Sequence, residues 1–223
     1  MATFTPLEDE LAKKATVKKQ QNEKAKPNTV KPDAVSAVLA KFNTWQKSVI
    51  GAVALVVLVA LYASFQPDSF FVERAIIISA PPAKIFDLVN DFHDWAKWSP
   101  WEKMDPNMKK TFDGPESGEG AVYHWVGNEK VGEGTMTILE SKKNDHVKIK
   151  VDFLKPYQAS NTVTFTFQVG ENQTLVTWGM TGKNNFMSKV MQLFTTMDKM
   201  VGNDFQNGLE GLKVLTQPGY KRQ

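Results

Sequence analysis

Side chains capable of acid–base or metal chemistry are sparse in this 223-residue chain. It has no cysteine, which excludes a thiolate nucleophile, a thiolate zinc site and a disulfide framework. The histidines, His93, His124 and His146, are far apart in sequence, which disfavours a multi-histidine metal site. Glu102 is the one nominee for a catalytic acid or base, although the sequence supplies no partner for it. We therefore predict no metal and no cofactor, and we favour binding over catalysis.

Aromatic and methionine side chains are the second group with a candidate binding role. Such side chains line apolar small-molecule sites, and methionine adapts to varied ligand shapes. They also fill ordinary cores, which is the alternative interpretation for each of them. The tryptophans between residues 95 and 101 are too closely spaced for a short loop to bury easily, so we expect them at a cavity mouth or in a bilayer interface. The predicted cavity lining is Trp95, Trp98, Trp101, Tyr123, Trp125, Phe153, Phe165, Trp178, Met180, Phe194 and Met197.

The elements that must position these side chains are mostly strands. Apolar and polar residues alternate at a period of two, as in Val147, Ile149 and Val151, which indicates an antiparallel sheet with one buried and one solvated face. A short helix is predicted over Ala83–Asn90, and a 3.6-residue apolar period predicts one long helix over Asn184–Leu215. Strands are predicted over Phe70–Ser79, Lys109–Asp113, Ala121–Val126, Gly132–Ser141, Val147–Phe153, Asn161–Val169 and Thr174–Thr181.

Ser48–Phe65 is an uncharged run of eighteen residues and the strongest local signal in the chain. A helix of this length reaches about 27 Å, close to the ~30 Å hydrocarbon core of a bilayer. Trp45 and Tyr62 lie near its two ends, where amphipathic rings favour the interface. A buried core helix and a cleaved signal peptide are the alternatives, but the run has no polar face and 47 residues precede it. We expect a retained single transmembrane helix over residues 48–65.

Charge is unevenly distributed along the chain, whose net charge is +3. Residues 1–47 contain nine lysines and five acidic residues, so the remainder is nearly neutral and gives no support for a nucleic-acid-binding face. We expect residues 1–47 to be a basic, mostly disordered tail, with an amphipathic helical pattern at 33–47. The lysine excess on this side of the span predicts that the tail is cytoplasmic and that the folded domain lies outside the cytoplasmic (inner) membrane.

Several segments of the folded region resemble one known superfamily. They are Val72–Arg74, Ile78–Phe86, Asp91–Trp95, Trp98–Trp101, Gly118–Gly120 with Tyr123 and Trp125, Val176–Gly182, Gly202–Phe205 and Gly208–Lys213. Together with the order of the elements they resemble the helix-grip fold of the START-like superfamily, also called SRPBCC or the polyketide cyclase/dehydrase and lipid-transport group. The resemblance implies an α+β domain over residues 70–217, followed by a tail at 218–223. It also implies a curved antiparallel sheet around the C-terminal helix, with a cavity between them that binds an apolar or amphipathic small molecule.

Three functions remain open on this evidence. The favoured one is a membrane-anchored domain that binds a hydrophobic or lipid-like small molecule. The second is an enzyme of the cyclase, dehydratase or hydrolase type that uses the same cavity, with Glu102 as its acid or base. The third is a protein-interaction module without a ligand, which a solid interior would favour. Because only residues 66–69 separate the span from the first strand, a reach of at most about 14 Å, we expect the domain to lie against the bilayer.

Overall fold

The computed structural model describes residues 41–221, and the chain divides into two compact units between Val56 and Val57. Residues 1–40 of the basic tail predicted over residues 1–47, with most of its helical pattern, lie outside the described residues, as do residues 222 and 223. The first helix, α3 (Thr44–Phe65), begins four residues before the predicted span and includes Thr44–Lys47 in its first turn.

Helix α3 is long and apolar enough to cross a membrane. Asn43 and Gln46 cap its beginning reciprocally: the Gln46 backbone N–H donates to Asn43 Oδ1 at 2.9 Å, and the Asn43 N–H donates to Gln46 Oε1 at 3.0 Å. Within the helix, the Ser64 hydroxyl donates to the Ala60 carbonyl at 2.9 Å, so this polar group does not require water. Most of its apolar side chains are exposed, in contrast to those of a core helix.

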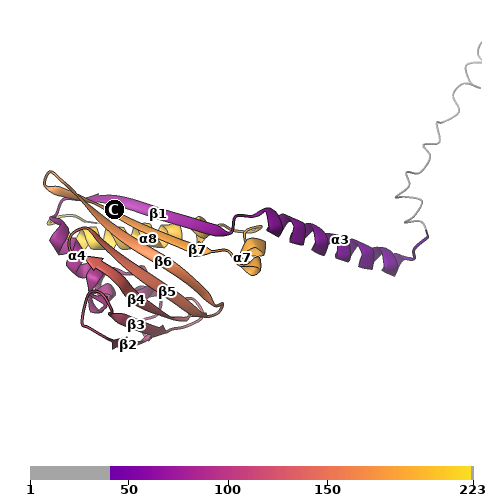
Figure 1. Cartoon of the computed structure of the whole chain (residues 1–223), viewed down its shortest axis with the longest axis horizontal. Coiled ribbons are helices and arrows are strands. Elements are labelled where there is room, and N and C mark those ends of the chain that lie inside the picture. The colour runs from indigo at the N-terminus through magenta and orange to yellow at the C-terminus, as the bar shows by residue number, and fades with distance from the viewer. Residues whose placement is uncertain (1–40, 222–223) are drawn as a thin grey trace, which may run out of the picture. The chain divides into compact units, whose positions relative to one another are not determined.

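The folded region contains one seven-stranded antiparallel sheet with the strand order β1-β7-β6-β5-β4-β3-β2 (Figure 1). Its strands are β1 (Ser69–Ile78), β2 (Lys109–Asp113), β3 (Val122–Val126), β4 (Glu133–Lys142), β5 (His146–Lys155), β6 (Ala159–Gly170) and β7 (Gln173–Lys183). The predicted alternation sets the register. In β6 and β7 the buried residues face one another as Val163–Met180, Phe165–Trp178 and Phe167–Val176. One face of the sheet therefore carries the core, as the sequence predicts.

Helices cover that face. Between β1 and β2 lie α4 (Pro82–Asn90), a 3-10 turn (Phe92–Asp94), α5 (Trp95–Trp98) and α6 (Pro100–Met104), and after β7 come α7 (Phe186–Met191) and α8 (Met197–Thr216). Phe205, Leu209 and Leu212 of α8 are fully buried in the core. A Cβ at Gly208 would lie only 2.5 Å from Trp178 Cζ3, so this glycine allows α8 to approach the sheet closely. The result is an α+β helix-grip fold.

The single helix predicted over Asn184–Leu215 is wrong, because the structure divides it into α7 and α8. Polar side chains begin each piece. Asn185 Oδ1 accepts from the Ser188 backbone N–H at 2.8 Å, and Thr196 Oγ1 accepts from the Lys199 N–H at 3.3 Å. Thr and Asn side chains compete with the helical backbone for such bonds and favour caps over helix interiors. The apolar period continues through the break, which is why periodicity alone did not reveal it.

Candidate ligand-binding cavity

A cavity of about 390 Å³ lies between the sheet and the first turns of α8. This volume is within the range of small-molecule sites. Its lining residues lie in the short helices, in α8, in β3 to β7 and in the loops before β2, between β3 and β4 and after β5, and most of them are aromatic, methionine or valine. The lining residues are Trp95, Ser99, Trp101, Glu102, Met104, Met108, Tyr123, Trp125, Lys130, Val131, Met136, Val151, Phe153, Lys155, Pro156, Val163, Trp178, Met180, Met197, Met200, Val201, Asp204 and Phe205.

Most of the side chains predicted to line a cavity do line this one: Trp95, Trp101, Tyr123, Trp125, Phe153, Trp178, Met180 and Met197. Trp98 and Phe165 are instead buried behind the wall, at 1% and 0% exposure, where both rings pack edge-on or tilted against Trp178. Phe194 was predicted wrongly. It lies in the break between α7 and α8 and is 86% exposed, because the polypeptide leaves the helical path on which the prediction placed it.

Trp95 and Trp98 of α5 are buried, so neither lies in a bilayer interface, whereas Trp101 is partly buried and lines the cavity. Trp95 Nε1 donates to the Val89 carbonyl and Trp98 Nε1 to the Leu88 carbonyl, each at 3.0 Å. Both acceptors lie in the last turn of α4, where carbonyls have no partner within the helix. Each hydrogen bond thus pairs a buried indole N–H with a carbonyl at the end of α4, so the short segment can bury both rings.

The wall facing α8 is a stack of aromatic rings. Trp178 lies parallel to Phe205 of α8, with 4.4 Å between ring centroids and 8° between planes. Trp101 packs edge-on against Trp178 at 5.6 Å. At the other end, Gly134 leaves room for Trp125, because a Cβ there would lie 2.4 Å from the indole ring. The Trp178 indole N–H is buried and has no hydrogen-bond partner within residues 41–221.

Glu102 reaches the cavity with a side chain that is 9% exposed, as required of the nominated acid or base. Both of its oxygens are already engaged. Tyr123 Oη donates to Oε1 at 2.8 Å, and Lys110 Nζ donates to Oε2 at 2.6 Å. Burial, followed by the hydrogen bond to Glu102, raises the pKa of the Tyr123 phenol above its ordinary value. The geometry is that of a charge-paired carboxylate that orients a neutral phenol.

Asp204 of α8 is a lining residue that the sequence analysis missed. It is half-buried, and within the described part of the chain its carboxylate has no hydrogen-bond or ion-pair partner. Burial raises the pKa of this carboxyl. The signal was present: lining residues of α8 recur at 197, 200, 201, 204 and 205, one helical stripe, and Asp204 is its charged member.

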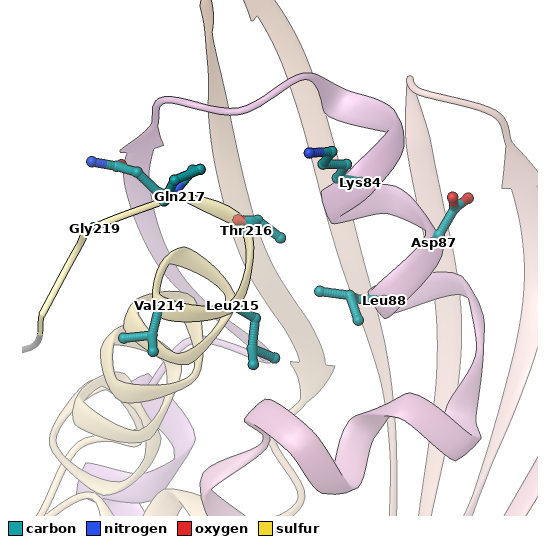
Figure 2. A pocket seen from close by; sticks show the side chains of 9 residues that line it. Lys84, Asp87, Leu88, Val214, Leu215, Thr216, Gln217 and Gly219 are labelled. Carbon is teal, nitrogen blue, oxygen red and sulfur yellow. The ribbon is translucent and has the colours of Figure 1, made fainter.

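A second hollow of about 500 Å³ lies at the opposite end of α8 and shares no lining residue with the cavity. Figure 2 shows Leu88 of α4 and Leu215 of α8 projecting into it, with Lys84 on the same side of α4. It is more open to solvent, and its wall includes the backbone after α8. Within residues 41–221 no group of three or more acidic or histidine side chains could hold a metal ion. The apolar cavity, the less open of the two, is therefore the candidate site.

Solved structures are similar to this chain at low sequence identity. A hypothetical protein, jhp0584, from Helicobacter pylori has a TM-score of 0.51 and 12% identity, and the match covers 70% of this chain and 92% of that one. Protein CV1439 from Chromobacterium violaceum has a TM-score of 0.49 and 14% identity, covering 69% and 99%. The Aha1 dimer from Colwellia psychrerythraea has a TM-score of 0.46 and 19% identity, covering 68% and 99%.

No curated protein matches the chain significantly in sequence. The sequence model of one family does match, over residues 70–216, which spans β1 to the end of α8 and includes every element that lines the cavity. Fold, cavity and sequence model thus agree over the same residues, and the chain belongs to the family described as polyketide cyclase / dehydrase and lipid transport.

Proposed function

We propose that this protein is a membrane-anchored binding protein whose helix-grip domain holds a hydrophobic or lipid-like small molecule in the cavity between the sheet and α8. The observation that carries the proposal is the cavity of about 390 Å³, lined mainly by tryptophan, methionine and valine. A hollow interior argues against a pure interaction module, since burying those side chains against one another would be more favourable than leaving space. The family description, which includes lipid transport, supports the same ligand class.

The cavity constrains the ligand. Its volume is near the lower end of the range for small-molecule sites, which favours one acyl chain or a compact ring system over a lipid with two buried chains. Within residues 41–221, the Asp204 carboxylate is an acceptor without a partner and the Trp178 indole N–H is a donor without one. A ligand with a hydroxyl or amino group directed at Asp204 would satisfy that carboxylate on binding. We therefore propose an amphipathic molecule with a hydrogen-bond donor.

The anchor is α3, which is proposed to span the cytoplasmic membrane once, with the N-terminal tail in the cytoplasm and the domain on the other side. Its length and composition support a span. The lysines at 41 and 47, before the apolar run, support the orientation. A domain tethered in this way would meet hydrophobic ligands at the bilayer, where they are concentrated.

A photoreactive fatty acid carrying a diazirine tests ligand binding in the full chain, held in detergent micelles. We expect crosslinks to peptides of β3 and β5, whose residues Tyr123 and Val151 line the cavity. Met136→Trp, which fills the cavity from β4, should reduce these crosslinks at least tenfold. Leu139→Trp on the same strand is the matched control, because Leu139 is half-exposed and outside the lining. Crosslinks to α3 report the micelle background. Labelling of β3 and β5 no stronger than that of exposed strands would overturn the proposal.

A catalytic role for the same cavity is the second candidate, favoured by two carboxylates, Glu102 and Asp204, in its lining. An enzyme would release a product that differs from what it binds. Small molecules that co-purify with the full chain, identified by mass spectrometry, should then differ in mass between the native protein and Glu102→Gln, because the variant would retain unconverted substrate. Identical bound molecules in both proteins would exclude the catalytic reading for Glu102.

A further inference from the structure

A group of exposed apolar side chains projects from α7 and the turn after it. We call Phe186, Met187, Met191, Leu193 and Phe194 the α7 patch; Phe186 is 60% exposed and Phe194 is 86% exposed. These residues are nearly consecutive, and they include large rings that water solvates poorly. A contiguous exposed apolar group of this kind marks a surface that meets a partner or a membrane.

Three polar contacts fasten the α7 patch to the linker that follows α3. The Asn184 backbone N–H donates to the Asp68 carbonyl at 2.8 Å, and Asn184 Nδ2 donates to the Pro67 carbonyl at 2.9 Å. Lys189 Nζ pairs with Asp68 Oδ1 at 2.6 Å, and only 13% of the lysine side chain is exposed. Figure 1 shows α7 next to the beginning of β1, in agreement with these contacts. These contacts therefore fix the position of the α7 patch relative to the linker.

The linker is held close to the end of the proposed span. Asp68 comes three residues after Phe65, the last residue of α3, a separation of at most about 11 Å. A bilayer has several ångströms of headgroup region on each side of its hydrocarbon core. The α7 patch thus lies within reach of the headgroups if α3 spans the membrane.

We infer that the α7 patch docks into the phospholipid bilayer that α3 crosses, with its phenylalanine, methionine and leucine side chains at the boundary between headgroups and acyl chains. Interfacial segments of this composition bury their apolar face about 5–10 Å deep. The bilayer is the occupant indicated by the linker, because these contacts hold α7 close to the end of the proposed span. The inference rests on the proposed anchor and extends it from a tether to a fixed orientation of the domain.

Docking would also place one end of the cavity at the membrane. Helix α8 begins with Met197, three residues after Phe194, and Met197, Met200 and Val201 all line the cavity. Met200 is also half-exposed, so this side chain contacts both the cavity and the exterior. A hydrophobic ligand could then move between bilayer and cavity past the first turn of α8 without crossing bulk water.

The chain contains no cysteine, so single cysteines carry a nitroxide label without a background. The full chain would be reconstituted in vesicles of phosphatidylcholine and phosphatidylglycerol, with labels at Phe194→Cys, Val169→Cys and Val56→Cys. Val169 is the matched control, because it is 70% exposed and lies far from α7. Its partner on β7, Thr174, is about 30 Å along the strand from Lys183, the residue at the α7 end of β7. Val56 lies in the apolar run of α3 and tests the anchor.

Collision rates with oxygen, which concentrates in the bilayer, and with a water-soluble nickel complex give the depth of each label. We expect the Phe194→Cys label to be several-fold more accessible to oxygen than to nickel, relative to the Val169→Cys label. A Phe194→Cys label as accessible to nickel as that at Val169, with the Val56→Cys label protected, would overturn docking and leave the anchor intact. A Val56→Cys label exposed to nickel would overturn the anchor itself.

Discussion

Replacing Asp204 with asparagine should stabilise the folded domain at neutral pH. The Asp204 carboxylate faces an apolar cavity and has no partner among the described residues, and burial raises its pKa. The charged form is therefore less favourable in the folded than in the unfolded state, and the destabilisation is present only where Asp204 is ionised. Asparagine has nearly the same shape, keeps a hydrogen-bonding group and cannot ionise.

The magnitude follows from the position of the side chain. A buried polar group without a partner costs about 1–3 kcal/mol and a charged one costs more, so the gain is the extra cost of the charge, which partial exposure of Asp204 to solvent limits to about 1 kcal/mol. For a domain of this size, about 1 kcal/mol corresponds to a rise of about 2–4 °C in Tm. Because the unfolded carboxyl titrates near pH 4 and the folded one at higher pH, the gain should be complete at neutral pH and disappear as the pH falls to that of the unfolded carboxyl.

Thermal unfolding of the full chain in detergent, followed by near-ultraviolet circular dichroism of the buried tryptophans, measures the effect at pH 7 and pH 4. Asp198→Asn on the same helix is the matched control. Arg74 pairs with Asp198 at 2.7 Å and lowers the pKa of that carboxyl. Its contribution is present above the unfolded pKa and lost as the pH falls, so Asp198→Asn should destabilise the domain at pH 7 and have little effect in acid.

A loss of stability in Asp204→Asn at pH 7, or a gain that persists unchanged at pH 4, would refute the reasoning. The first result would mean that the carboxylate has a favourable interaction in the folded state, and the second would mean that the gain does not depend on its ionisation. If the stabilised variant also binds a donor-bearing ligand less tightly, then the Asp204 carboxylate lowers the stability of the domain and raises its affinity for the ligand, a pattern typical of binding sites.

Two further substitutions test how the cavity wall is held. Gly208→Ala would place a Cβ 2.5 Å from the Trp178 ring and should destabilise the domain by about 1–3 kcal/mol in urea unfolding, reduced by the stability that alanine gains over glycine in a helix. Gly179→Ala is the control and should be nearly neutral, because the nearest contact of its Cβ would be at 3.4 Å. Equal effects of the two substitutions would contradict the proposed close approach of α8 to the sheet. Tyr123→Phe would remove the donor to Glu102 Oε1 and should lower the free energy of unfolding by about 1–2 kcal/mol. Tyr157→Phe, at an exposed ring, should leave it almost unchanged. An unchanged stability in Tyr123→Phe would mean that water replaces the phenol hydroxyl.

The sheet was predictable because each strand carries its own evidence. The period-two pattern in β5, β6 and β7 is local, and the structure extends these three predicted strands by one or two residues at each end. The division of the last helix was not predictable from period, since Phe186 and Phe194 lie on the expected apolar stripe but outside the core. The capping threonine at 196 was the better signal, and its effect depends on a local competition for hydrogen bonds that hydrophobic spacing does not record.

The site was predictable in composition more than in detail. Aromatic residues on inward-facing strand positions, such as Tyr123, Trp125 and Trp178, line the cavity because alternation fixes their direction. Whether a ring lines the space or stands behind it, as Phe165 does, depends on depth within the curved sheet, which sequence spacing does not give. Asp204 could not be predicted in this way, because an apolar helical stripe is recognised by its hydrophobic residues and Asp204 is a charged residue within such a stripe.

The cavity has two kinds of wall, and this difference bears on how a ligand would pass. On the sheet side, Trp178 is fixed by stacking on Phe205 and by edge contacts with neighbouring rings, so this wall should keep its shape. Four of the six lining methionines are on the other side, in the short helices, the loop before β2 and the first turns of α8: Met104, Met108, Met197 and Met200; the other two, Met136 and Met180, are on strands. Unbranched thioether chains repack at low cost. The adaptable wall is the one that adjoins the α7 patch, so a ligand arriving from the bilayer would meet side chains able to yield before it reaches the rigid rings that hold it.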